Sequence, residues 1–196
     1  MEKINFIKTF IPQGDFREKY EHGGMMVRHL AAVLDEKMGA YECYECTVPI
    51  GEYDEGEIQK AFAEFSAKMD ALKLKQAKAD KIAEITAYDT SSSVNGFILN
   101  GLLVWLDKAT RVGLMNSTTI AKAAGQKTTT LWLGGLKLVV DCDKAIQLLS
   151  ALEMYALECF NVTASHKQAV SELTTIEEVE AYNYKSGYPK MLEMSV

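Results

Sequence analysis

The sequence predicts a mixed α+β protein, with antiparallel hairpins packed on a long helix, preceded by a small N-terminal β-rich segment and another long helix. Three observations indicate this fold class. Residues 55–87 carry a helical pattern without proline. Two pairs of apolar runs flank the two-residue turns at 100–101 and 134–135, which is typical of β-hairpins. A second long helical pattern follows the second hairpin and provides a helix for the strands to pack on.

This pattern divides the chain into three regions. Residues 1–54 form a β-rich segment, residues 55–87 a linking helix, and residues 88–196 a compact α+β domain. The polar run Asp-Thr-Ser-Ser-Ser at 89–93 separates the helix from the compact domain. Clusters of this kind usually mark loops, so we predict a boundary there.

Within the N-terminal segment, strand-forming residues at 41–50 follow a turn at 37–40, which indicates a small hairpin. The apolar segment 27–34 fits either a strand or a helix. The sequence His-Gly-Gly at 22–24 predicts a flexible joint.

The predicted linking helix carries a hydrophobic stripe. Ile58, Phe62, Phe65, Met69 and Leu72 recur at spacings of four, three, four and three, which is a heptad pattern. At ~1.5 Å per residue the helix would be about 45 Å long, longer than a small domain needs. Two alternatives follow: an amphipathic helix that lies on its own domain, or a short coiled coil that joins copies of the chain.

Shorter helices are expected around the second hairpin. Ser117 or Thr118 is a candidate cap for a short helix that Gly125 ends. Thr174, with Glu177 three residues later, is a candidate capping box for a last short helix.

Five residues are candidates for structural roles or partner contacts. Trp105 and Trp132 lie in the two hairpins, and we expect both to pack between sheet and helix. Asp107 and Arg111 are four apart, which suits an ion pair on a helical turn, although a buried or interface arginine is an alternative. His166 lies on the second long helix, where a capping or core hydrogen bond is its expected use.

The cysteines do not predict redox or zinc chemistry. Cys43 and Cys46 form a C-x-x-C, but they lie in a predicted strand, where positions three apart point to opposite faces. The two thiols would therefore diverge, and a zinc site would need a second ligand pair. Cys142 and Cys159 are expected to be small buried groups.

Composition and charge exclude several classes of function. The net charge is −6, from 21 basic and 27 acidic residues, and no basic run with interleaved aromatics indicates nucleic-acid binding. No leader pattern and no apolar run of the ~20 residues that span a bilayer is found, so we expect no membrane partner. The three histidines are dispersed, and no nucleotide-binding or nucleophile motif occurs. We therefore expect no catalytic residues, no cofactor and no metal site.

An ordered series of motifs lies between residues 81 and 190. The motifs are KIAEITAYDTSSSVNGF at 81–97, WLDKATR at 105–111, TTLW at 129–132, CFNVTASHK at 159–167 and YNYKSGYP at 182–189. The series resembles an uncharacterised domain family common in phage and prophage proteins and often encoded near tail-fibre genes. The resemblance covers a little over half of the chain and implies a tail or tail-fibre context, but it supplies no catalytic residues.

Three hypotheses follow. The first is a virion-associated structural or adaptor protein of the tail or tail-fibre apparatus, homo-oligomeric through the heptad stripe and bound to other tail or fibre proteins. The second is a tail-fibre assembly chaperone that acts in the host cytoplasm and is absent from the particle. The third, least favoured, is an enzyme that uses Cys43 and Cys46 or acts on a glycan. The expected location is the virion, or the host cytoplasm during assembly.

Overall fold

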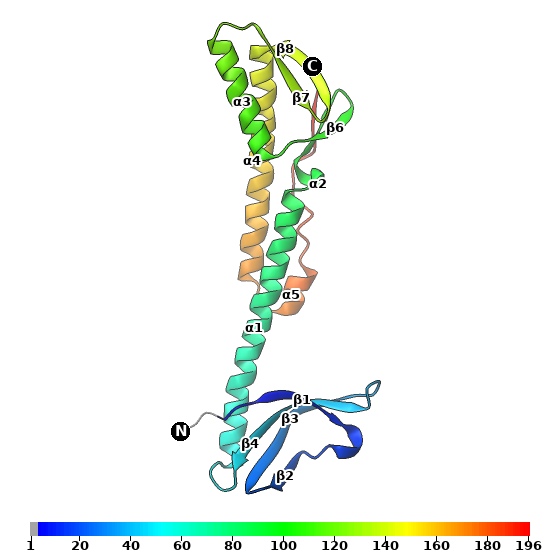
Figure 1. The fold of residues 1–196 in the computed structure, drawn as a ribbon, viewed down its shortest axis with the longest axis vertical. Helices are drawn as coiled ribbons and strands as arrows, with labels where there is room; N and C mark the ends of the chain where they lie inside the picture. Colours follow the sequence, from blue (N-terminus) through cyan, green and yellow to red (C-terminus); the bar gives the residue numbers. More distant parts are fainter. Residues whose placement is uncertain (1–3) are drawn as a thin grey trace. The chain divides into compact units, whose positions relative to one another are not determined.

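The computed structural model describes residues 4–196 and confirms the mixed α+β class. The chain forms two compact units, residues 1–73 and residues 74–196. The division falls within helix α1 (Glu55–Asp89), which matches the helix predicted at 55–87. Figure 1 colours the first unit blue to cyan, and the second continues through green to red. The last turns of α1 belong to the second unit, where Ile85 is buried with Val170 and Val179.

The N-terminal unit is built on a four-stranded antiparallel sheet with the order β1-β4-β3-β2. The segment 27–34, which fitted strand or helix, is a strand, and Gly23 and Gly24 of the His-Gly-Gly sequence form a tight turn between two strands. The elements are β1 (Ile7–Pro12), a 3-10 turn η1 (Gln13–Asp15), β2 (Lys19–His22), β3 (Met25–Asp35) and β4 (Ala40–Pro49).

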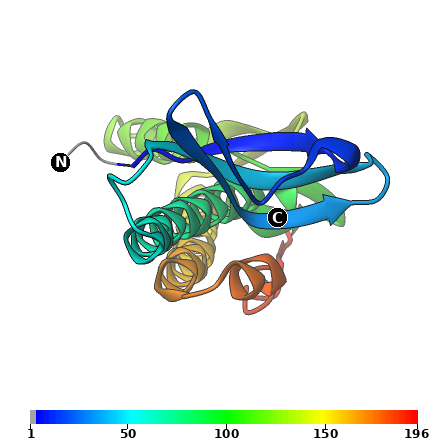
Figure 2. The same cartoon turned by 90° about the horizontal axis from the view of Figure 1, so that it is seen from below.

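One face of this sheet is covered by the first turns of α1, as Figure 2 shows. Asp54 and Glu57 fix the start of the helix, since each side chain accepts a hydrogen bond from the other residue's backbone N–H, at 2.8 and 2.9 Å. The buried side chains between sheet and helix form a small core of Met26, Leu30, Cys46, Val48 and Ile58.

The C-terminal unit contains both predicted hairpins. Asn100 and Gly101 have φ angles of 50° and 82°, and Gly134 and Gly135 have 57° and 87°, as a tight two-residue hairpin turn requires. The first hairpin gains a parallel strand near the end of the chain, giving the sheet order β6-β5-β9, and the second forms the pair β7-β8. The strands are β5 (Gly96–Leu99), β6 (Leu102–Trp105), β7 (Thr128–Leu133), β8 (Leu136–Asp141) and β9 (Leu192–Met194).

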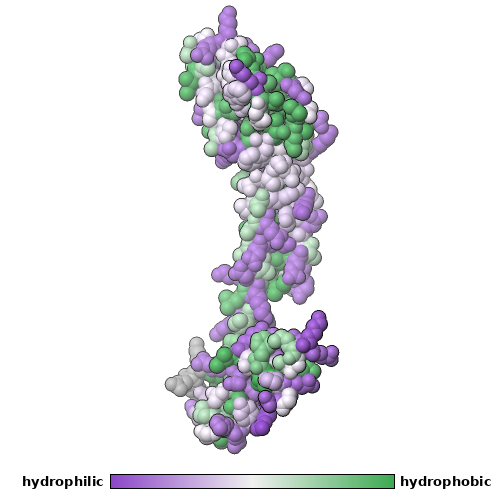
Figure 3. Space-filling model, turned by 45° about the vertical axis from the view of Figure 1, so that its right-hand side comes forward, coloured by the Kyte–Doolittle hydropathy of each residue, from purple (hydrophilic) through white to green (hydrophobic). Residues whose placement is uncertain are grey.

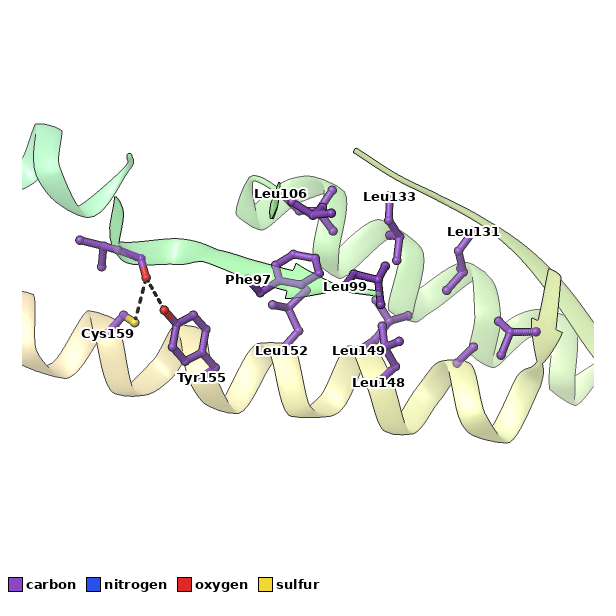
Figure 4. Close-up of a cluster of buried hydrophobic side chains, with 14 residues drawn as sticks. Phe97, Leu99, Leu106, Leu131, Leu133, Leu148, Leu149, Leu152, Tyr155 and Cys159 are labelled. Carbon is purple, nitrogen blue, oxygen red and sulfur yellow. Dashed lines mark hydrogen bonds between the residues drawn. The ribbon is translucent and has the colours of Figure 1, made fainter. Parts of the chain in front are cut away.

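Four helices complete the C-terminal unit beside the end of α1. They are α2 (Ser92–Asn95), α3 (Lys108–Ala123), α4 (Cys142–Glu172) and α5 (Ile176–Ala181). Helices α3 and α4 lie side by side (Figure 1). The inner faces of both hairpins pack with α4 in one core, where Phe97 and Leu99 lie opposite Leu149 and Leu152 (Figure 4).

One predicted helix start was wrong, and one predicted helix cap was off by one residue. Helix α3 begins at Lys108 and is capped by Asp107, ten residues before Ser117, the earlier of the two predicted caps, because the Asp107 side chain accepts a hydrogen bond from the Thr110 N–H at 2.8 Å. The last short helix is capped by Thr175 and Glu178, one residue later than predicted, because the Thr175 backbone is extended and its hydroxyl accepts from the Glu178 N–H. In residues 4–196 no helix has the length and apolar character to span a bilayer.

Candidate protein-binding surface

The structure divides the predicted heptad stripe between two environments. Ile58 is fully buried in the core of the N-terminal unit. Phe62 and Phe65 are half-buried, and each ring lies 5.2 Å from the ring of Phe6. Leu72, by contrast, is 58% exposed. The first half of the stripe therefore covers the chain's own sheet, as in the amphipathic alternative, and Met69 and Leu72 make no part of that core.

Two buried basic residues that the sequence analysis did not single out, Arg28 and His29, make hydrogen bonds within the N-terminal unit. Arg28 is buried in β3, and its Nη2 donates to Glu55 Oε1 at 2.7 Å. Its Nη1 donates to the carbonyl oxygen of Glu18 at 3.0 Å. The hydrogen bond from Arg28, followed by one from Gln59, holds the pKa of the Glu55 carboxyl below its ordinary value. This arginine thus joins the start of α1 to the sheet.

His29, the next residue in β3, is buried on the other face of the sheet. Its Nε2 lies 3.1 Å from Glu45 Oε2, and its Nδ1 contacts the carbonyl oxygen of Arg17. The rings of Phe16 and Tyr20 lie 5.8 and 5.9 Å away. A hollow of about 400 Å³ lies beside it. Both ring nitrogens of His29 are therefore in contact with oxygen atoms of the chain itself.

All four cysteines are buried free thiols. Cys43 and Cys46 lie in strand β4, and both are free thiols, not bridged to each other. Burial raises the pKa of both thiols, and it also raises the pKa of the Cys159 thiol. A catalytic cysteine needs a lowered pKa and access to substrate. None of these three thiols has either property.

The family-like motifs meet along one side of α4. Tyr155 Oη donates to the Val94 carbonyl oxygen at 2.7 Å, and Cys159 Sγ donates to the same oxygen at 3.4 Å (Figure 4). Thr163, one turn further, donates to Asp89 Oδ1 at 2.7 Å. Hydrogen bonds from α4 thereby reach residues of α1 and α2, and the two bonds to Val94 are buried.

His166 continues this row towards the C-terminal segment. Its Nδ1 lies 2.9 Å from Tyr182 Oη, and its Nε2 lies 2.9 Å from the carbonyl oxygen of Ser186. The Tyr188 hydroxyl lies 2.9 Å from Thr163 Oγ1. These contacts hold the segment after α5 against α4, and they use both nitrogens of the histidine. The motif residues in this row therefore maintain the fold.

Asp107 and Arg111 do not pair with each other as the spacing predicted. Asp107 caps α3, and its two carboxylate oxygens accept from the backbone N–H and the hydroxyl of Thr110. Arg111 is buried and donates from Nε to Glu153 Oε1 on α4 at 2.9 Å, and from Nη1 to the Leu106 carbonyl oxygen at 2.8 Å. The buried-arginine alternative is therefore the one that the structure shows.

The two tryptophans correct the sequence expectation most clearly. Trp105 is 41% exposed and Trp132 is 59% exposed, so the prediction that both pack in the core was wrong. Strand alternation explains Trp132, because its neighbours Leu131 and Leu133 are fully buried and point to the opposite face. Trp105 likewise follows the buried Val104.

Four large hydrophobic side chains thus lie exposed on the outer faces of the two hairpins. This hairpin surface consists of Leu103, Trp105, Trp132 and Val139. The two hairpins touch, since a Cβ on Gly134 would lie 3.1 Å from Val104 Cγ1. Figure 3 shows hydrophobic residues gathered on the C-terminal unit. Exposed hydrophobic patches commonly mark protein-binding sites, so this surface is the candidate functional site.

The described residues do not bring together side chains that could bind a metal ion. Within residues 4–196 no group of three or more His, Cys, Asp or Glu side chains is arranged to hold a metal ion.

Comparison with known proteins shows a family match for the C-terminal part of the chain. Residues 76–184, more than half of the chain, match the model of a domain of unknown function, DUF4376. No curated protein and no solved structure matches the chain. The match begins within α1 and covers both hairpins, α3, α4 and α5. The chain therefore belongs to the DUF4376 family.

Proposed function

We propose that this chain is a protein-binding structural or adaptor component of a phage tail or tail-fibre apparatus, and that it binds its partner through the hairpin surface. The observation that carries the proposal is the exposure of Trp105 and Trp132 on neighbouring hairpins. Tryptophan is enriched among the residues that dominate binding energy at protein interfaces. Covering two such side chains with a partner would remove a large apolar area from water and so stabilise the complex.

The tail context rests on the resemblance of the motifs between residues 81 and 190 to a domain family of phage and prophage proteins. The hairpins that carry the surface lie within the matched domain, residues 76–184. Residues of the same motifs, such as Asp89, Thr163 and Tyr188, hold the domain together through hydrogen bonds. The motifs thus build the scaffold that presents the surface.

The binding test compares the hairpin surface with an exposed hydrophobic residue elsewhere. The tail and fibre proteins of the encoding phage are expressed individually and titrated against the chain. Trp132→Ala should weaken binding of the cognate protein by about 2 kcal/mol, roughly 30-fold. Ile120→Ala, which also removes a solvent-exposed side chain, should leave the affinity unchanged. Equal effects of both variants, or no binding to any tail or fibre protein, would reject the proposal.

A tail-fibre assembly chaperone would use the same surface, and particle composition separates the two roles. Mass spectrometry of purified virions should detect the chain if it is a structural or adaptor component. Its absence from particles, together with binding to a fibre protein in the host cytoplasm, would assign the chaperone role instead.

A further inference from the structure

Strand β6 leaves one edge of its sheet open. In the sheet order β6-β5-β9, β6 lies at the end, and no other strand of residues 4–196 pairs with its outer side. The two-residue turn makes Leu99 and Leu102 a hydrogen-bonded pair, and Phe97 and Val104 the next such pair. The backbone N–H and C=O groups of the residues between, including Leu103, therefore point away from β5 towards the open edge.

The open edge of β6 lacks the usual protection against pairing. Natural edge strands carry charges, prolines or bulges that prevent association with another strand. Other edges of this chain have them: Lys8 and Pro12 in β1, Lys19 in β2, Lys137 in β8 and Glu193 in β9.

Strand β6, in contrast, has the sequence Leu-Leu-Val-Trp, with no charged residue and no proline. Strand β7 is the other uncharged edge, but threonines occupy its positions 128 and 130, whose backbone groups face outwards. An exposed, wholly hydrophobic edge is therefore a feature of β6 alone among the strands described.

We propose that β6 pairs with β6 of a second copy of this chain, antiparallel about a two-fold axis, so that two three-stranded sheets join. In this register Leu103 of one copy lies opposite Trp105 of the other, and Val104 lies opposite Val104. Leu103 and Trp105 both direct their backbone groups outwards, so each Leu103–Trp105 pair exchanges N–H···O=C bonds in both directions. The edge is thus complementary to itself, as a two-fold interface requires.

Side chains and charges agree with this register. Leu103 and Trp105 lie on the same face and are 58% and 41% exposed, and their cross-strand contact removes apolar area from water on both copies. The nearest acidic residue, Asp107, would lie opposite Gly101 of the second copy. No like charges meet, which matters for a chain with a net charge of −6.

In the two neighbouring registers, one of the two outward-facing residues of β6 lies opposite a residue outside the strand. A shift by one pair places Leu103 opposite Leu103 and leaves Trp105 opposite Gly101, outside the strand. A shift the other way leaves Leu103 opposite Asp107, which caps α3. Only the Leu103–Trp105 register pairs both outward-facing residues of β6 with each other.

The first test is the mass of the full chain in solution, measured by light scattering from about ten to several hundred micromolar. The wild type should show twice the monomer mass, and Leu103→Pro should show the monomer mass. Proline at 103 removes only an outward N–H, so the β5–β6 ladder is kept. Thr130→Pro makes the same change at the β7 edge and should remain a dimer.

Outcomes that overturn the proposal are specific. A monomeric wild type throughout this range, or a Leu103→Pro variant with the wild-type mass, contradicts it. Circular dichroism checks that each variant is folded, and Leu103→Lys, which places a charge on the edge, replaces Leu103→Pro if the proline variant unfolds. The two proposals fail separately, because the mass measurement needs no other protein and the titrations vary Trp132, which lies in β7 and outside the β6 edge.

Cysteine cross-linking tests the register. A mixture of Leu103→Cys and Trp105→Cys chains should form a disulfide-linked dimer under mild oxidation, since opposite Cα atoms in such a pair lie about 5.5 Å apart. Neither variant alone should link, because its own position in the other copy lies beyond the ~7 Å limit for a disulfide. Efficient linking of Leu103→Cys with itself would reject the register, and the parent chain with four buried cysteines gives the background.

Discussion

Thr163 on α4 donates a hydrogen bond of 2.7 Å to Asp89 at the end of α1. The Tyr188 hydroxyl lies 2.9 Å from the same threonine oxygen, so one side chain joins two helices to the C-terminal segment. Because Thr163 is buried, its removal leaves the carboxylate and the phenol without this partner.

Thr163→Val should therefore lower the free energy of unfolding by about 1–3 kcal/mol, since it keeps the shape and removes the hydroxyl. Thr119→Val is the matched control, because the exposed Thr119 hydroxyl bonds only to the Met115 carbonyl oxygen in its own helix. Its effect should be under about 0.5 kcal/mol. Urea unfolding followed by circular dichroism measures both, and equal losses would contradict the assigned role of Thr163.

Arg111 and Glu153 should be energetically coupled, whereas Arg111 and Asp107 should not. A double-mutant cycle with Arg111→Met and Glu153→Gln should give a coupling of about 1–2 kcal/mol, because the pair joins α3 to α4. The cycle with Asp107→Ala should be near zero, although this change alone removes the cap of α3 and costs about 1 kcal/mol. A larger coupling between Arg111 and Asp107 than between Arg111 and Glu153 would instead support the Asp107–Arg111 ion pair that the spacing predicted.

The stability that Glu55 provides should depend on pH. Its pKa is lowered in the folded chain by the hydrogen bond from Arg28, so folding favours the ionised form. This contribution is complete above the unfolded-state pKa and is lost as the pH falls through the folded-state value. The difference in unfolding free energy between the wild type and Glu55→Gln should therefore shrink between pH 7 and pH 3. A difference that grows on acidification would contradict the assignment.

The buried thiols should resist modification in the native state. Burial and raised pKa values leave Cys43, Cys46 and Cys159 with little thiolate near neutral pH. Labelling by a disulfide reagent should be slow in buffer and fast in concentrated urea, with labelled sites identified by peptide mass spectrometry. Rapid native labelling of Cys43 or Cys46 would revive the thiol-enzyme hypothesis.

Local sequence determined most of the elements of this protein. The Asn-Gly and Gly-Gly turns predicted both hairpins, because few residues other than glycine and asparagine adopt the positive φ angles that these turns need. The two long helices followed from periodicity and from the absence of proline. Such patterns act over a few residues and need no knowledge of distant contacts.

Tertiary structure decided which face of each element is covered, since coverage depends on segments far away in the sequence. In the folded chain Trp105 and Trp132 are exposed. Arg111 pairs with Glu153, which lies 42 residues away in the sequence. Ile58 and the aromatic residues that follow it cover the chain's own sheet. Amphipathic periodicity shows that a stripe will be buried, but the identity of its partner is a long-range property.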